Sequence, residues 1–314
     1  MRADLRLAFC FPGQGSQTVG MGRAFHDASP VARATFEEAS DALEFDVGKL
    51  CFEGPADALQ LTANTQPAVL TVSVAAARVL AERGLHPGLV GGHSLGEYSA
   101  LVVAGALRFR DAVRVVRRRG EFMQEAVPVG RGAMAAILGV ELTVVEEICR
   151  EAAGDEVVEV ANVNSPAQVV IAGHRTAVER AVALAAGRGG RRSMLLPVSA
   201  PFHCRLMAPA AERLAAVLAE LPAAAPSVPV VRNVDAGLTT RGEEVGPFLV
   251  RQVTAPVRWT DCVARMAAEG CRTLLEVGPG KVLTGLLKRI DSELTGFAIE
   301  DPAGLDRAAA ALGT

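Results

Sequence analysis

Gly91-Gly92-His93-Ser94-Leu95-Gly96-Glu97 is the stretch of this chain that best indicates its fold, because it places a serine in a Gly-x-Ser-x-Gly frame. The apolar pair Leu89-Val90 precedes it, and residues 97–106, rich in good helix formers, follow. A serine at a sharp turn between a strand and a helix needs small residues two positions before and two positions after it, and the two glycines of this frame supply them. The sequence therefore predicts a nucleophile elbow that presents Ser94 to a cleft.

Strands and helices alternate on both sides of this elbow. An apolar strand over Leu5 to Phe11 runs into the turn-rich loop Pro12 to Gln17. A long helix rich in alanine and valine is expected from Gln66-Pro67-Ala68 to about Arg83, with a glycine after its last residue. Charged and apolar residues at helical spacing predict another helix over Phe109 to Ala126. This alternation is typical of an α/β domain whose parallel sheet is covered on both faces.

The pattern changes from about Gly130 onward. The elements predicted there are strands at 133–138, 157–162, 168–172 and 193–198 and helices at 143–153 and 176–186. The order β-α-β-β-α-β is the ferredoxin-like pattern. We therefore predict a large, hydrolase-like α/β domain made of residues 1–129 and 199–314, with a small ferredoxin-like subdomain, residues 130–198, inserted into it. A cleft between the two is the expected place for a ligand site.

The composition of the 314 residues is that of an ordinary globular protein, with 50% hydrophobic and 21% charged residues. The net charge of -3 leaves no basic footprint for nucleic acid. No signal-peptide pattern opens the chain and no long uncharged stretch could span a bilayer, so a cytoplasmic protein without membrane contact is expected. The 6 cysteines are scattered without a Cys-x-x-Cys pair, which indicates buried thiols rather than disulfides or a zinc site.

A serine becomes a good nucleophile only when a base accepts its proton, and 5 histidines are available. His93 lies beside Ser94 in the elbow, where its side chain is expected to point elsewhere. His203 lies in the turn-prone segment Val198 to Cys204, where the chain returns to the large domain. The same context is also typical of an ordinary loop histidine with its hydrogen bonds satisfied, so the residues alone leave the choice of base open.

Several spaced motifs follow one another from near residue 9 to near residue 285. They are Phe11-Pro12-Gly13-Gln14-Gly15-Ser16-Gln17, Gly92-His93-Ser94-Leu95-Gly96-Glu97-Tyr98, Arg119-Gly120 with Met123-Gln124, Asn162 to Ser165, Ala200-Pro201-Phe202-His203 and Gly278-Pro279-Gly280. Together they resemble the malonyl-CoA:acyl carrier protein transacylase family. Several motifs in one order are far more specific than any single motif, and the inserted β-α-β-β-α-β unit agrees with the resemblance.

The resemblance implies a two-step, ping-pong transfer of malonyl from malonyl-CoA to the phosphopantetheine thiol of acyl carrier protein. Ser94 would attack the thioester and carry the malonyl group as an ester, with His203 as the base. Backbone amides of Gln14 and Leu95 would hold the oxyanion of each step. The main-chain carbonyl at Gln252 would orient the histidine in place of a carboxylate.

The resemblance also implies how the substrate is bound. Arg119, one of three successive arginines on a predicted helix, would pair with the free carboxylate of malonyl, because a charge buried in a cleft is costly without a partner. Phe202 would crowd an α-methyl branch and so favour malonyl over methylmalonyl. His93, Met123 and Asn162 would complete the pocket. Metal ions and redox cofactors are not implied, since CoA enters as part of the substrate, and a monomer is expected.

Other functions share some of these features. A trans-acting acyltransferase of a polyketide synthase would carry the same motifs, so the sequence does not separate fatty acid from polyketide synthesis. A serine hydrolase or thioesterase also uses Gly-x-Ser-x-Gly, but an α/β-hydrolase needs an acid between Ser94 and His203. Asp111 and Asp155 are the only aspartates there, both in expected helical or turn surface, and the Asp-Gly pair typical of patatin-like enzymes is absent. A non-catalytic docking protein would not need the retained serine, histidine and arginine.

A carrier protein that is acidic would dock on a basic surface near the mouth of the cleft. Such a surface is usually only a solvated face of the protein, so this interpretation depends on where the basic residues lie. The candidates are Arg188, Arg191, Arg192, Lys288 and Arg289.

Overall fold

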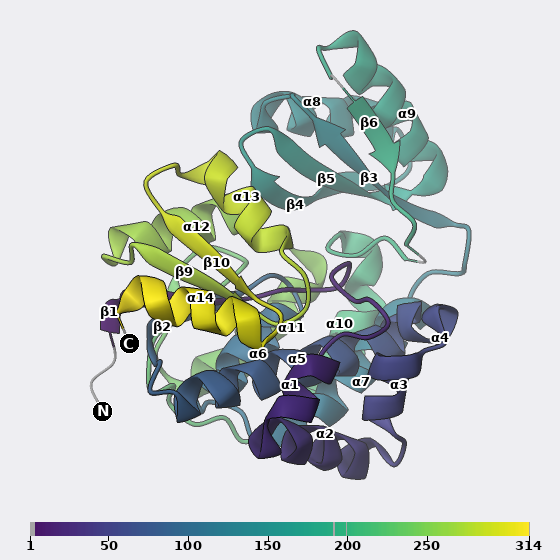
Figure 1. The fold of residues 1–314 in the computed structure, drawn as a ribbon. Coiled ribbons are helices and arrows are strands. Elements are labelled where there is room, and N and C mark those ends of the chain that lie inside the picture. Colours follow the sequence, from purple (N-terminus) through teal and green to yellow (C-terminus); the bar gives the residue numbers. More distant parts are fainter. Residues whose placement is uncertain (1–3, 191, 199, 314) are drawn as a thin grey trace.

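The computed structural model describes residues 4–190, 192–198 and 200–313, whose strands form a larger and a smaller sheet (Figure 1). The larger sheet has six strands in the spatial order β10-β9-β1-β2-β7-β8. Neighbours pair in parallel except β7 and β8, which are antiparallel. The predicted parallel sheet is therefore confirmed. Its strands are β1 (Asp4–Phe11), β2 (Pro87–Gly92), β7 (Val230–Val231), β8 (Leu238–Thr239), β9 (Thr273–Val277) and β10 (Thr295–Ile299).

Both faces of the larger sheet are buried, as the side chains of β1 show. Leu7, Phe9 and Phe11 belong to one hydrophobic cluster and Ala8 and Cys10 to another, because successive side chains of a strand point to opposite faces. The second cluster is closed by α12 (Trp259–Ala268) and α13 (Val282–Ile290). The first is closed by α1 (Arg23–Ala28), α2 (Pro30–Leu43), α3 (Val47–Glu53), α4 (Ala56–Gln60), α5 (Thr62–Glu82), α6 (Gly96–Val103), α7 (Phe109–Glu125), α10 (Ala208–Ala219), α11 (Val245–Thr254) and α14 (Pro302–Leu312).

The smaller sheet stands beside the larger body with two helices on one face, as Figure 1 shows in teal. Its elements are β3 (Gly132–Leu138), α8 (Leu142–Ala153), β4 (Val158–Ser165), β5 (Gln168–His174), α9 (Arg175–Gly187) and β6 (Arg192–Leu195). The strands lie in the order β4-β5-β3-β6 and pair antiparallel throughout. This order and pairing agree with the predicted ferredoxin-like pattern, whereas the domain limits at residues 130 and 198 stay a prediction.

Helix α5 begins at Thr62, four residues before the predicted start, and holds Pro67 in its second turn. A proline there forfeits one hydrogen bond to the preceding turn, which ordinarily favours a helix start at or just before it. The extra turn is stabilised by the Thr65 hydroxyl, which donates to the carbonyl of Leu59 at 2.6 Å. Burial of the Thr65 and Gln66 side chains supports it further.

Strand β6 ends at Leu195, three residues earlier than predicted. The amide of Leu196 still donates to the carbonyl of Met134 at 2.9 Å, but Pro197 has no N–H to continue the ladder. Residues 196–198 leave the sheet and line a cavity instead. Strand β4 extends beyond its predicted end to Ser165.

Two other features of the chain bear on its expected surroundings. All six cysteines are buried and free, which confirms the interpretation as buried thiols. In the part of the chain that the structure describes, no helix is long and apolar enough to cross a membrane.

Candidate active site

Ser94 lies on a sharp turn between the end of β2 and the start of α6, as predicted for a nucleophile elbow. Its backbone φ angle is 51°, in the left-handed region that residues other than glycine rarely adopt. The two glycines of the frame let the backbone pass close to itself. A Cβ at Gly92 would lie 1.9 Å from the backbone of Gly96, and one at Gly96 would lie 2.0 Å from the carbonyl oxygen of Phe11. Any larger residue at either position would therefore push the turn apart.

His203 is the histidine that meets the serine. Its Nε2 lies 2.7 Å from Ser94 Oγ, and its Nδ1 lies 2.9 Å from the backbone oxygen of Gln252. A carbonyl oxygen can only accept, so Nδ1 carries the proton and Nε2 is free to accept the serine proton. The ring is 4% exposed, and burial together with the charge of Arg119 lowers the pKa of His203 to about 3. The imidazole is therefore neutral at physiological pH, as a general base must be.

Arg119 reaches the same serine from α7. One terminal nitrogen donates to Gln66 Oε1 at 2.8 Å, and the other donates to Ser94 Oγ at 3.1 Å and to Gln252 Oε1 at 2.9 Å. The residue is 2% exposed, and all three of these acceptors are uncharged. Its neighbour Arg118 on the helix is exposed, which agrees with the expectation that at most one or two of the three arginines face the cleft.

The loop after β1 lies against the elbow. A Cβ at Gly13 would lie 2.5 Å from the carbonyl oxygen of His93, so only glycine allows this approach. Gln14 and Leu95 both line the cavity around Ser94. Among the described residues no hydrogen bond uses the backbone amide of either, which leaves two donors beside the serine, as an oxyanion hole requires.

These residues open onto one cavity of about 770 Å³ between the two sheets. The predicted pocket residues His93, Met123, Asn162 and Phe202 all line it, together with the serine, histidine and arginine. Gln252 does not line it but lies behind the serine and histidine. The wall from the smaller sheet and the segment after it consists of Met134, Asn162, Leu196, Pro197 and Val198.

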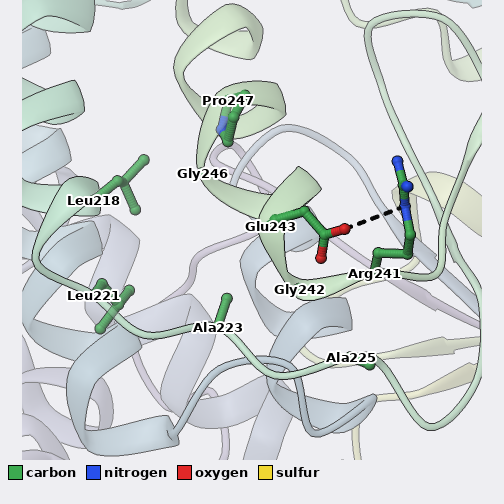
Figure 2. A pocket seen from close by; sticks show the side chains of 9 residues that line it. All are labelled: Leu218, Leu221, Ala223, Ala225, Arg241, Gly242, Glu243, Gly246 and Pro247. Carbon is green, nitrogen blue, oxygen red and sulfur yellow. Dashed lines mark ion pairs between the residues drawn. The ribbon is translucent and has the colours of Figure 1, made fainter.

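Figure 2 shows a different pocket, of about 610 Å³, between the end of α10 and the start of α11. Leucine and alanine side chains line one side, and Arg241, which pairs with Glu243 at 3.5 Å, lines the other. None of the predicted site residues lines this pocket, and its lining includes no serine, cysteine or histidine. The predicted nucleophile and its predicted base therefore belong to the cavity between the sheets.

A buried polar network behind the elbow was missed by sequence reasoning. Asn233 Oδ1 accepts the amide N–H of Ser94 at 2.7 Å, and its Nδ2 donates to the carbonyl of Gly92 at 2.7 Å. Gln252 Nε2 donates to the carbonyl of Ser94 at 3.0 Å and to Glu97 Oε2 at 2.7 Å. This network holds the backbone on both sides of the nucleophile.

The sequence carried uneven signals for these missed residues. Glu97 follows the second glycine of the frame, and a carboxylate in an otherwise apolar segment is a visible signal. Gln66 is a lone amide at the start of an alanine- and valine-rich helix. Asn164, whose Oδ1 lies 2.9 Å from His93 Nε2, falls within the motif Asn162 to Ser165 but was given no role there. Asn233 has no local signal at all.

The basic residues predicted to receive a carrier protein are spread over both parts of the molecule. Arg188 pairs with Glu151, and Arg192, Lys288 and Arg289 are exposed. Arg191 lies outside the described residues. Nothing in the geometry tests docking on these side chains, so this stays a prediction. Within the described residues, no group of three or more His, Cys, Asp or Glu side chains could hold a metal ion.

Known proteins are similar to this chain in sequence and in fold over nearly its whole length. The model of the acyl transferase domain family matches residues 8–298. The malonyl CoA-acyl carrier protein transacylase of Escherichia coli (strain K12) is 54% identical over 301 residues, which are 96% of this chain and 97% of that protein.

Two solved structures show the same agreement. The malonyl-CoA:acyl carrier protein transacylase from Xanthomonas oryzae pv. oryzae superposes with a TM-score of 0.96 at 48% identity, over 99% of both chains. A malonyl-transacylase in complex with its type II PKS acyl-carrier protein has a TM-score of 0.95 at 48% identity, over 96% of this chain and 98% of that one. This chain therefore belongs to the malonyl CoA-acyl carrier protein transacylase family of acyl transferases.

Proposed function

We propose that this protein transfers the malonyl group of malonyl-CoA to the thiol of an acyl carrier protein, through an ester on Ser94. The names of its relatives support both substrates. One observation of the geometry carries the proposal furthest. The buried Arg119 guanidinium lies 3.1 Å from the oxygen of a serine that a neutral histidine also contacts, so a nucleophile and a carboxylate-binding group share one cavity.

In the first step, His203 Nε2 takes the proton of Ser94 Oγ as this oxygen attacks the thioester carbon. The carbonyl oxygen becomes an oxyanion and accepts hydrogen bonds from the amides of Gln14 and Leu95. When the intermediate collapses, the carbon–sulfur bond breaks and the CoA sulfur receives the proton from Nε2. The malonyl group is then held as an ester of Ser94, and the histidine is neutral again.

In the second step, the phosphopantetheine thiol of the carrier protein enters the vacated part of the cavity. His203 Nε2 takes the thiol proton, and the sulfur attacks the ester carbon with the same two amides at the oxyanion. The bond between the carbon and Ser94 Oγ breaks, and Oγ recovers the proton from Nε2. The chain and its two substrates supply every atom and electron of these steps, so the proposed reaction needs no metal or redox cofactor.

The acyl group is selected by the walls of the cavity. The malonyl carboxylate is two carbons from the ester carbon, and a guanidinium in contact with Ser94 Oγ is placed to bind it. Charge-assisted hydrogen bonds of this kind offset the cost of burying the carboxylate. Phe202 lines the same cavity beside His203, where its ring would crowd a methyl branch on the carbon between the two carbonyl groups. These contacts favour malonyl over acetyl and methylmalonyl.

The carrier protein is the second substrate of the proposed reaction. The relatives are named for acyl carrier protein, and one solved relative is bound to a carrier of a type II PKS. Carriers of fatty acid and of polyketide synthesis therefore both belong in the test. Comparing the rates of malonyl transfer to each would decide which of them this enzyme serves.

The proposal is tested by the intact mass of the protein after brief mixing with malonyl-CoA, methylmalonyl-CoA or acetyl-CoA. We expect a malonyl adduct that disappears when a carrier protein is added, and no adduct on Ser94→Ala. Steady release of free CoA without an adduct would contradict the proposal and indicate a hydrolase. An adduct of equal size on Ser94→Ala would contradict the assignment of the nucleophile.

A further inference from the structure

A buried carboxyl group behind the elbow has no part in the mechanism above. Glu97 lies in the first turn of α6, three residues after the nucleophile, and is 3% exposed. Its Oε2 accepts hydrogen bonds from the amide of Asn233 at 3.1 Å and from Gln252 Nε2 at 2.7 Å. Both donors are neutral. A carboxylate that is buried among neutral groups is costly to ionise, and burial raises the pKa of Glu97 to about 7.

The side chain of Gln252 joins this acid to the substrate-binding arginine. Its Nε2 donates to Glu97, while its Oε1 accepts from Arg119 at 2.9 Å. One amide thus bridges a buried anion and a buried cation. The other side-chain acceptors of Arg119 are the Gln66 amide oxygen and the Ser94 hydroxyl, which are also neutral. The charge of Arg119 lowers the pKa of Glu97 and the charge of Glu97 raises the pKa of Arg119, so each favours the ionised form of the other.

We propose that Glu97 is the counter-charge of Arg119 in the empty site, held through Gln252, and that its charge sets how strongly the enzyme prefers acyl groups that carry a carboxylate. The inference rests on the proposed function and concerns the same cavity. An ionised Glu97 already neutralises part of the field of Arg119, so the malonyl carboxylate is held less strongly. A neutral Glu97 leaves the full positive charge to the substrate.

Because the pKa of Glu97 is about 7, its charge changes between pH 6 and pH 9, whereas burial lowers the pKa of His93, which lines the same cavity. Burial raises the pKa of the Tyr98 hydroxyl to about 12 and that of the Cys262 thiol well above its usual value, and it lowers the pKa of His203 to about 3. The groups that face Glu97 electrostatically or as hydrogen-bond partners are Arg119 on α7, Arg232 after β7, Tyr98 on α6, Cys262 on α12, Gln252 on α11 and Asn233.

The test is a competition between two acyl donors on the wild-type enzyme. Malonyl-CoA and excess acetyl-CoA are mixed with the protein, the reaction is quenched within the first turnover, and the two adducts on Ser94 are counted by intact mass. The ratio of the adducts, divided by the ratio of the two donor concentrations, is the ratio of the two kcat/KM values, in which effects on the serine, the histidine and the CoA moiety cancel. We expect the malonyl preference to fall by about tenfold as the pH rises from 6 to 9. A ratio that stays constant would overturn the inference.

Glu97→Gln separates the charge from the hydrogen bonds. Both donors use a single carboxylate oxygen, so the amide oxygen of the variant can accept from both. We expect the variant to keep a malonyl preference at pH 9 that equals or exceeds that of the wild type at pH 6, with no dependence on pH. A variant that keeps the wild-type pH profile would overturn the inference, because the slope would then come from another group.

The chain offers a matched control in Glu276, a second buried carboxyl, on β9. It accepts from the amides of Leu283 and Thr284 in the core on the other face of the sheet, and burial likewise raises its pKa. Glu276→Gln should keep the wild-type pH profile.

The outcomes separate the two proposals. If Glu97→Gln does not fold, the wild-type profile alone decides the inference. A failure of the proposed function is recognised separately, as the absence of any malonyl adduct on the wild-type protein at every pH.

Discussion

Replacing Arg119 by methionine tests the substrate assignment most directly. The change removes the guanidinium but keeps an unbranched side chain that can fill the buried space. The oxygens of Gln66, Ser94 and Gln252 each lose a donor, at 2.8, 3.1 and 2.9 Å. Those losses affect every acyl donor alike. Only a donor with a free carboxylate also loses its charged partner.

The size of the effect follows from the burial of the arginine. Removing one partner of a buried charge pair costs about 3–5 kcal/mol, because the remaining charge is left uncompensated. The malonyl over acetyl ratio of kcat/KM values should therefore fall by roughly 10² to 10³ or more, since about 1.4 kcal/mol is a factor of ten. The loss that both donors share is about 1.5–3 kcal/mol for each hydrogen bond donated by the charged guanidinium. It lowers both rates and leaves their ratio unchanged.

The assay is the initial rate of CoA release with malonyl-CoA and with acetyl-CoA in the presence of carrier protein. Arg118→Met is the matched control, since Arg118 precedes Arg119 on the same helix but is exposed, and it should leave both rates within about twofold. A circular dichroism spectrum and melting curve establish that the Arg119 variant is folded. Equal losses for the two donors would refute the assignment of Arg119 to the carboxylate.

Further changes around the site have distinct expected results. Because burial lowers the pKa of His203 from 6.5 to about 3, the unfolded chain binds the extra proton first. The free energy of unfolding should therefore fall as the pH drops from about 6.5 towards 3, and a denaturant titration of His203→Gln should show a smaller fall. Asn233→Ala removes the two hydrogen bonds that hold the elbow at residues 92 and 94. It should lower kcat/KM for malonyl-CoA and acetyl-CoA by the same factor and reduce the free energy of unfolding by about 2–4 kcal/mol. A selective loss for malonyl-CoA would contradict this role. Phe202→Ala should raise the rate with methylmalonyl-CoA relative to malonyl-CoA by about tenfold, and an unchanged ratio would show that the ring does not crowd the branch.

Much of the fold was accessible from local pattern. The elbow, the strands of the smaller sheet and the helix over residues 109–125 were predicted to within a few residues, since alternation and helical spacing are properties of neighbouring residues. The predicted start of α5 was wrong because Pro67 normally opens a helix, whereas the hydrogen bond from Thr65 to Leu59 and the burial of Gln66 stabilise one more turn. The predicted end of β6 was wrong because the apolar residues 196–198 line a cavity and do not continue the sheet.

The candidate site was only partly visible in the sequence. Ser94 can be identified from its neighbours in the sequence, because the backbone of a nucleophile elbow requires glycines at fixed positions before and after the serine. His203 was singled out by the family resemblance, and the structure places its ring 2.7 Å from a serine that is 109 residues away in the chain. Gln252 was expected to act through its main-chain carbonyl, which does contact His203. Its side chain proved to join Arg119 and Glu97, which no local pattern indicates.

The sequence by itself determined the class of fold and the elbow that carries Ser94, the predicted nucleophile, because these depend on steric and hydrophobic demands within a few residues. Only the tertiary structure decided which buried side chains hold the backbone around Ser94 and face the charge of Arg119. Buried polar groups must find partners wherever the fold brings them, and Asn233, Gln252 and Glu97 find theirs across more than a hundred residues of chain. The charge balance at Arg119 follows from those contacts, and so it belongs to the folded protein and not to any one segment.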